Sequence, residues 1–191
     1  MKKIIHKAYW NPDKEQQWLN SLAAKGLALT DYSWMRYAFE ETEPGKYIYE
    51  IEFLEKSRKS PESELYLRFL EDAGVEVVAS YMRWVYLRKK ASDGPFAIYS
   101  DCESKIRYLK RIRNFWIGII IMELFAGFLN VGLSIVYLFV EALKASSKLS
   151  WWVNFLVGLL CTGIAIVFFF TLLLPIYLQI RKVRKEQALH D

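Results

Sequence analysis

One carboxylate stands inside a long apolar run, and it is the residue of this sequence with the clearest chemical consequence. Glu123 lies about eight residues into the apolar run 115–139. If that run crosses a bilayer, an ionised carboxylate there costs roughly 2.5–3.5 kcal/mol. Three interpretations of Glu123 stay open. It is neutral and hydrogen-bonded across to a second helix, with the Thr171 carbonyl that Pro175 leaves free as one acceptor; it contacts a partner; or it has a proton-linked or transport role.

Other side chains with reactive chemistry are sparse. The two histidines are His6 and His190, and the two cysteines, Cys102 and Cys161, have no metal-ligand partner at motif spacing. The sequence contains no glycine-rich phosphate loop and no serine nucleophile elbow. Glu52 is one of two carboxylates that alternate along a strand, and we interpret it as a solvent-facing charge. We expect no catalytic, cofactor-binding or metal-binding residue, and no enzymatic activity.

Two apolar runs, 115–139 and 151–178, must position Glu123. Each exceeds the roughly 20 residues that a membrane-spanning helix needs. Small and polar residues recur at helical spacing on one face of each run, which is how helices pack in lipid. We expect an antiparallel hairpin with Asn130 at the depth of Thr162. The candidate residues for an intramembrane interaction, including one between copies of the chain, are Glu123, Asn130, Ser134, Asn154 and Thr162.

The cations around these runs predict their orientation. Nine lie before the first run and after the second, whereas the connecting loop has two. The positive-inside rule then places both termini in the cytoplasm, in a multi-pass protein of the plasma membrane. The same nine cations are expected to contact anionic lipid headgroups; they are Lys105, Arg107, Lys110, Arg111, Arg113, Arg181, Lys182, Arg184 and Lys185.

Charge separates the chain into two halves. Residues 1–100 contain 15 Lys or Arg and 15 Asp or Glu, so the whole formal charge of +5 comes from residues 101–191. Because the excess cations flank apolar runs, we expect no nucleic-acid partner. The predicted domains are a cytoplasmic domain (1–100), a basic juxtamembrane helix (101–114), a first span (115–139), an extracytoplasmic loop (140–150), a second span (151–178) and a basic tail (179–191).

The first half predicts an α+β domain with an antiparallel sheet and two helices. The helices start at Asn11-Pro12 and Ser60-Pro61 and end at Gly26 and Gly74, and each precedes two strands, at 27–32 and 35–40 and at 75–80 and 84–89. Leu65, Phe69 and Leu70 would form the apolar face of the second helix. The helices match at an offset of 48 residues and the following strands after a one-residue slip. This suggests a duplicated helix–strand–strand unit, with chance similarity as the alternative.

Further strand signals lie between and beside these units. Pro44-Gly45 between the apolar runs 37–41 and 47–53 predicts a β-hairpin, and residues 4–10 could add a strand. Aromatic residues are dense on these strands, which indicates core filling or a groove that stacks a ligand. The one-residue slip between the strands of the two units would make Arg36 and Arg83 equivalent positions. The candidate residues for a cytoplasmic interaction are Arg36, Arg83, Trp34 and Trp84. No helix breaker separates Asp101 from the first span, so one long helix is expected there.

Several stretches resemble bacterial proteins of the domain-of-unknown-function family 2812. They are 18–26 (WLNSLAAKG), 36–39 (RYAF), 44–47 (PGKY), 69–74 (FLEDAG), 84–89 (WVYLRK) and 98–101 (IYSD). The resemblance covers roughly residues 7–113 and implies no particular activity. Members of this family are similar to membrane-anchored accessory proteins and are often encoded beside PadR-like transcription regulators. The resemblance therefore implies a sensing or signalling role.

Together these features lead us to expect a non-enzymatic module that binds an unidentified protein and couples it to the membrane. The alternative is an accessory or immunity-type subunit of a membrane complex such as a transporter, acting through the hairpin.

Overall fold

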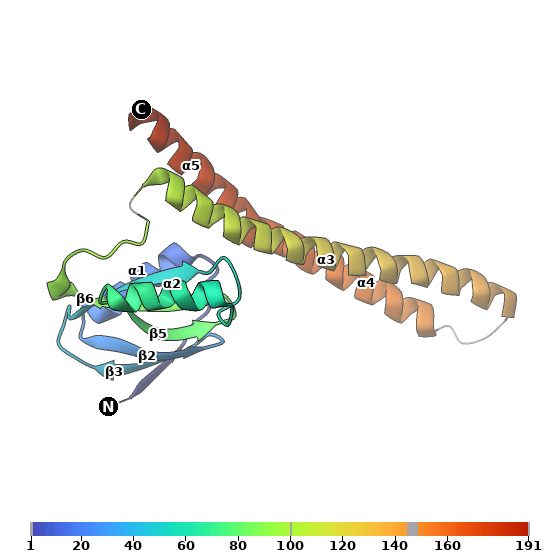
Figure 1. The fold of residues 1–191 in the computed structure, drawn as a ribbon. Coiled ribbons are helices and arrows are strands. Elements are labelled where there is room, and N and C mark those ends of the chain that lie inside the picture. Colours follow the sequence, from blue (N-terminus) through green and yellow to red (C-terminus); the bar gives the residue numbers. More distant parts are fainter. Residues whose placement is uncertain (1, 100, 145–148, 191) are drawn as a thin grey trace. The chain divides into compact units, whose positions relative to one another are not determined.

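The computed structural model describes residues 2–99, 101–144 and 149–190, in two compact units (Figure 1). Unit 1 is Met1–Ser104 and unit 2 is Lys105–Asp191. Residues 145–148 of the predicted extracytoplasmic loop lie outside the described residues.

Unit 1 repeats one arrangement of strand, helix, strand and strand. The first copy is β1 (Lys3–His6), α1 (Pro12–Ala23), β2 (Leu27–Ser33) and β3 (Arg36–Glu41), and the second is β4 (Tyr47–Phe53), α2 (Pro61–Asp72), β5 (Glu76–Tyr81) and β6 (Trp84–Lys90). Each copy forms an antiparallel three-stranded sheet with its last strand in the middle, in the orders β1-β3-β2 and β4-β6-β5. The predicted α+β class is confirmed. Each repeated unit has one more strand than the predicted helix–strand–strand unit, and that strand lies before the helix.

The two copies share a bulge at the same place. The pairing of β2 with β3 shifts between Leu29 and Asp31, and that of β5 with β6 shifts between Val77 and Ala79. These shifts lie 48 residues apart, so the offset of the helices continues through the strands. The predicted one-residue slip is therefore wrong, and Arg36 and Arg83 are not equivalent positions. The register instead relates Trp34 to Met82 and Arg36 to Trp84.

The predicted hairpin between β3 and β4 is also wrong. β3 is hydrogen-bonded to β1 on one side and to β2 on the other, so neither of its edges is open. β4 instead pairs with β6 along its whole length. The Pro44-Gly45 turn, with Gly45 at φ 74°, therefore connects one sheet to the other.

The helix boundaries follow from the predicted caps. The side chain of Asn11 accepts the Lys14 amide at 3.2 Å, and the hydroxyl of Ser60 accepts the Ser63 amide at 3.2 Å. Proline follows each cap, where its missing N–H costs nothing. Gly26 follows α1 at φ 81°, and a Cβ there would lie 2.7 Å from the Thr42 carbonyl oxygen. Both the backbone conformation and the space therefore require glycine at this position.

Two apolar clusters fill unit 1. The first joins α1 to both sheets through Leu19, Ala23, Leu29, Tyr37, Phe39, Tyr49, Ile51 and Tyr86. The second lies between α2 and its own sheet and includes Leu67, Leu70, Val85 and Leu87, with Phe96 and Ile98 packed against it. Two expectations fail here. Leu65 and Phe69 are 71% and 66% exposed, and Glu52 is buried, where its carboxylate accepts the Tyr99 hydroxyl.

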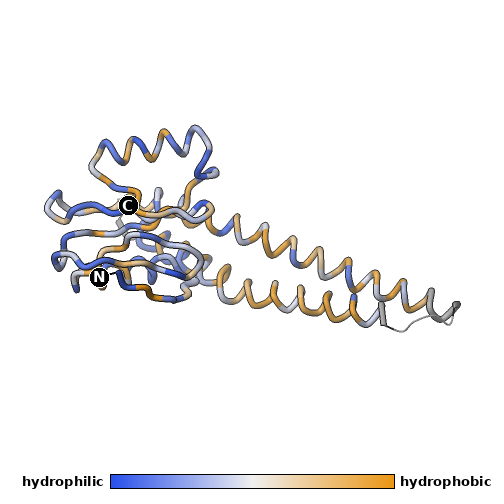
Figure 2. The backbone as a smooth tube through the Cα atoms, turned by 90° about the horizontal axis from the view of Figure 1, so that it is seen from below, coloured by the Kyte–Doolittle hydropathy of each residue, from blue (hydrophilic) through white to orange (hydrophobic). Residues whose placement is uncertain are grey.

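Unit 2 is built from long apolar helices, shown by their colour in Figure 2. α3 (Cys102–Lys144) runs without a break, as predicted, and α4 (Leu149–Phe168) continues through the π-helical segment η2 (Phe169–Leu173) into α5 (Leu174–His190). Two stretches, Cys102–Phe139 and Trp151–Ala188, are long and apolar enough to cross a membrane.

Glycines set the approach of α3 to α4. A Cβ on Gly127 would lie 2.6 Å from the Thr162 hydroxyl, and one on Gly158 would lie 2.7 Å from a Val131 methyl group. Side chains at these two positions would therefore push the helices apart. The close approach is direct evidence that the two apolar helices pack as a hairpin.

Candidate functional site

The connections β2–β3 and β5–β6 hold bulky residues in an unusual backbone conformation. Each connection has two residues, because Ser33 pairs with Arg36 and Tyr81 with Trp84. Trp34 and Met35 have φ of 33° and 63°, as a type I′ turn requires. In the second turn Met82 has φ 55°. Asparagine and glycine normally occupy such positions, because large side chains are strained there.

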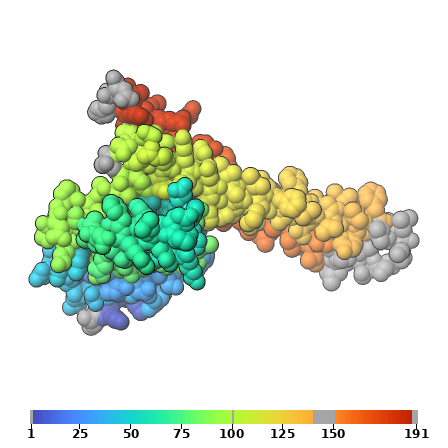
Figure 3. Space-filling model, viewed as in Figure 1, coloured from blue at the N-terminus to red at the C-terminus, as the bar shows by residue number. Residues whose placement is uncertain are grey.

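These turns display their side chains to solvent. Trp34 and Met82 are each 65% exposed, and the Trp34 ring lies 6.0 Å from the Tyr81 ring between centroids. The two turns therefore form one surface, which we call the turn patch: Trp34, Tyr81 and Met82. Figure 3 shows unit 1 as a space-filling surface, coloured from blue to green along the chain.

Aromatic contacts connect the turn patch to the core. The Tyr32 ring lies 6.1 Å from Tyr81, 4.7 Å from Tyr37 and 4.4 Å from Tyr86. The Tyr32 hydroxyl also accepts the Met35 amide at 3.4 Å. Tyr32 thus contacts the β2–β3 turn through the Met35 amide and packs against both sheets.

A buried carboxylate lies at the inner end of these contacts. Glu15 is 8% exposed, and its Oε1 accepts hydrogen bonds from the hydroxyls of Tyr37 at 2.6 Å and Tyr86 at 2.7 Å. Burial raises the pKa of Glu15, and the two hydrogen bonds only partly oppose that. Burial, with the negative charge of Glu15, raises the pKa of both tyrosines. The Glu15 carboxylate therefore connects α1 to β3 and β6. The sequence did not predict this role, because an acidic residue in the first turn of a helix normally faces solvent.

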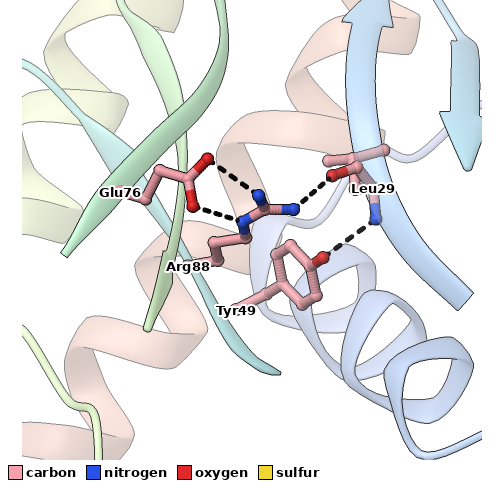
Figure 4. A network of polar contacts seen from close by, with 4 residues as sticks. All are labelled: Leu29, Tyr49, Glu76 and Arg88. Atoms are coloured by element: carbon pink, nitrogen blue, oxygen red, sulfur yellow. Dashed lines mark hydrogen bonds and ion pairs between the residues drawn. The ribbon is translucent and has the colours of Figure 1, made fainter. Parts of the chain in front are cut away.

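A second network holds the bulged strand β2 against the other sheet (Figure 4). The Arg88 guanidinium donates to both Glu76 carboxylate oxygens, at 2.7 and 2.8 Å, and to the Leu29 carbonyl at 3.2 Å. The Leu29 amide donates to the Tyr49 hydroxyl at 2.9 Å. Side chains of the second sheet thus satisfy the backbone of β2 beside its bulge and hold β2 against that sheet.

The four candidates in unit 1 lie apart. Trp34 belongs to the turn patch, while Trp84 is half-buried with its ring 4.6 Å from that of Phe53. Arg36 pairs with Asp31 at 3.3 Å, and Arg83 donates to the Leu54 carbonyl through Nε at 2.9 Å. Sequence reasoning missed Tyr81 and Met82, although the two-residue spacing between strands was a usable signal.

The polar candidates in unit 2 mostly bond to their own helix. Asn130 donates to the Ala126 carbonyl at 2.8 Å, Ser134 to that of Val131 at 2.7 Å and Thr162 to that of Gly158 at 2.8 Å. Asn154 is half-buried on α4. Thr162 lies against Gly127, so the expected depth match with Asn130 is wrong by about one helical turn.

Glu123 is half-buried on α3. The described residues provide no hydrogen bond or ion pair for its carboxylate. Thr171, which we expected opposite it, is exposed in η2 and donates to the Val167 carbonyl at 2.7 Å. Within the described ranges, no group of three or more His, Cys, Asp or Glu could hold a metal ion.

Comparison with known proteins identifies the family but no relative of known activity. No curated protein and no solved structure matches the chain. The model of the family described as Protein of unknown function (DUF2812) matches residues 11–121, from the cap of α1 into α3. This match covers more than half of the 191 residues and contains the turn patch and both polar networks. The chain therefore belongs to the DUF2812 family.

Proposed function

We propose that this protein is a membrane-anchored, non-enzymatic binding module. Unit 2 is held in the bilayer, and unit 1 binds a protein partner on the cytoplasmic side. The observation that carries the proposal is the exposure of the apolar helices. Only 17% and 22% of the residues in their most apolar stretches are buried, and this exposure supports contact with lipid.

The basic residues favour the plasma membrane, with both termini in the cytoplasm. Nine Lys or Arg flank the outer ends of the two spans, and the connection holds two. The five before the first span and the four after the second would contact anionic headgroups. The proposal also includes an interaction between copies of the chain through the hairpin. It includes no interaction with nucleic acid.

A protein partner fits the outer face of α2. Leu65 and Phe69 lie one helical turn apart and are both largely exposed, so they form an apolar stripe on this helix. Binding an amphipathic segment of a partner would bury this stripe. A PadR-like regulator is the proposed partner, and a signalling role would follow from that interaction.

The first experiment tests insertion and orientation in intact cells. A cysteine introduced near either terminus should be inaccessible to an impermeant thiol reagent until the cells are permeabilised. The protein should also stay with the membrane in alkaline carbonate. Release by carbonate, or labelling of the termini from outside, would refute the anchored arrangement.

The second experiment tests the partner surface. A Leu65→Ser, Phe69→Ser variant should lose a co-purifying PadR-like regulator in mild detergent, while the neighbouring exposed change Arg68→Ser should keep it. Equal recovery from both variants would show that α2 is not the binding face.

The half-buried Glu123 favours one alternative, an accessory subunit of a membrane complex that acts through the hairpin. An apolar helix keeps such a residue only when something neutralises or pairs it. Glu123→Gln should be harmless if the side chain is normally protonated. Loss of function at normal abundance, with unit 1 still binding its partner, would favour the accessory role.

A further inference from the structure

The turn patch is the strongest candidate for a site beyond those already proposed. It combines strain, exposure and repetition. Trp34, Met35 and Met82 all have positive φ, a conformation that is strained for a bulky residue. Trp34 and Met82 occupy equivalent positions of the two repeats and have the same exposure of 65%. Stability alone would favour Asn or Gly at both.

From these observations we infer that the turn patch is a lipid-binding site, which enters the interfacial layer of an anionic bilayer. The inference rests on the proposed membrane attachment, because that attachment supplies the bilayer. Two further features of unit 1, its side-chain chemistry and its tether, favour lipid over other occupants.

The chemistry of the patch suits the headgroup region. Tryptophan and tyrosine concentrate at that depth, where the ring is in apolar surroundings and the N–H or O–H meets water. The neighbouring charges lean positive. Lys7 donates its amide to the Met35 carbonyl at 2.9 Å and Arg83 lies beside Met82 in the second turn, while Arg36 follows the first turn and pairs with Asp31. The ammonium of Lys7 lies 5.0 Å from the centre of the Trp18 ring.

The tether makes a weak lipid contact effective. Thirteen residues of α3 precede Phe115, which is about 20 Å of helix. Unit 1 is therefore confined close to any bilayer that holds the spans, and its effective concentration at the surface is high. A contact too weak to recruit a free protein can then still be occupied.

A dye at the turn patch of the full chain tests this site. Met82→Cys is labelled with an environment-sensitive fluorophore after Cys102 and Cys161 are replaced by serine. Glu43→Cys is the matched control, because Glu43 is exposed beyond the opposite end of β3. The proteins are reconstituted into vesicles of phosphatidylcholine, with or without phosphatidylglycerol, that carry headgroup spin labels.

The Met82 dye should lose about half of its emission in anionic vesicles, as expected for a group 5–10 Å into the interface. It should lose clearly less in neutral vesicles, and the Glu43 dye should lose little in either. Trp34→Cys gives a second label with the same expected result, in case labelling at position 82 disturbs the fold.

Each negative outcome has a distinct meaning. Chains that insert stably but show no quenching at positions 34 and 82 would overturn the lipid site and leave the anchor intact. Chains that fail to insert would refute the proposed attachment and the lipid site with it. Crosslinking of either position to a protein in native membranes, with no quenching in vesicles, would reassign the turn patch to a protein partner.

Discussion

The buried carboxylate of Glu15 provides the sharpest test of how unit 1 is held together. Its Oε1 is the acceptor for two buried tyrosine hydroxyls. Glu15→Ala removes that acceptor, and each buried hydroxyl left without one costs about 1–3 kcal/mol. We expect the free energy of unfolding of unit 1 to fall by about 2–5 kcal/mol, after some relief from no longer burying a carboxylate. Glu15→Gln keeps an Oε1 acceptor and should cost about 1 kcal/mol or less.

The pH dependence has a definite sign. Because burial raises the pKa of Glu15, the folded chain binds a proton at pH values where the unfolded chain has released it. Stability should therefore rise as pH falls from neutral towards 4.5, and it should stop changing through this group below that value. The Gln variant lacks this contribution, so its stability should fall further below that of the wild type as the pH is lowered.

Hydrogen exchange measures both effects in the full chain in mild detergent. The readout is amide protection in β3 and β6, at several concentrations of urea and between pH 5 and 7. Glu64→Gln is the matched control, since Glu64 is exposed on the first turn of α2. Wild-type protection in the Ala variant, or an unchanged pH slope in the Gln variant, would show that the Glu15 contacts do not stabilise the fold.

Three further predictions concern the other contacts. Gly127→Val should separate the two helices of the hairpin and lower the resistance of the hairpin to SDS. Gly163→Val should not, because a Cβ at position 163 would meet no atom within 4 Å. Arg88→Met should cost about 1.5–3 kcal/mol of unit 1 stability, because the Glu76 carboxylate and the Leu29 carbonyl both lose their donor, and urea unfolding would measure it. Replacing Trp34-Met35 by Asn-Gly should raise the unfolding midpoint in urea while it reduces the quenching of a dye at position 82 by lipid, and a lower midpoint would argue against turn strain.

The sequence predicted local structure well because its signals are local. Proline and glycine around each helix, and the alternation through residues 47–53, set boundaries that agree with the structure to within a few residues. Strand pairing was less accessible. The Pro44-Gly45 turn predicts only a reversal of the chain, and β1 had already taken the edge of β3 that β4 would need.

The interior polar groups were also missed, for a related reason. Glu15 and Glu52 look like ordinary surface charges until residues far along the chain, Tyr86 and Tyr99, bring hydroxyls to them. Leu65 and Phe69 gave the opposite error, because apolar spacing on a helix does not say whether anything covers it. The turn patch needed the exact register of two sheets before Trp34 and Met82 became equivalent.

The π-helical segment changes the direction of everything that follows it. Pro175 has no N–H and its ring crowds the preceding turn, and the Leu174 amide reaches back five residues to the Phe169 carbonyl. One surplus residue in a turn displaces later side chains by about 100° around the axis. A helical wheel drawn straight through the second apolar run would therefore assign the cations at 181–185 to the wrong side of the rod. Deleting one residue between 169 and 173 would turn those cations to a new azimuth while leaving the length and hydropathy of the span almost unchanged.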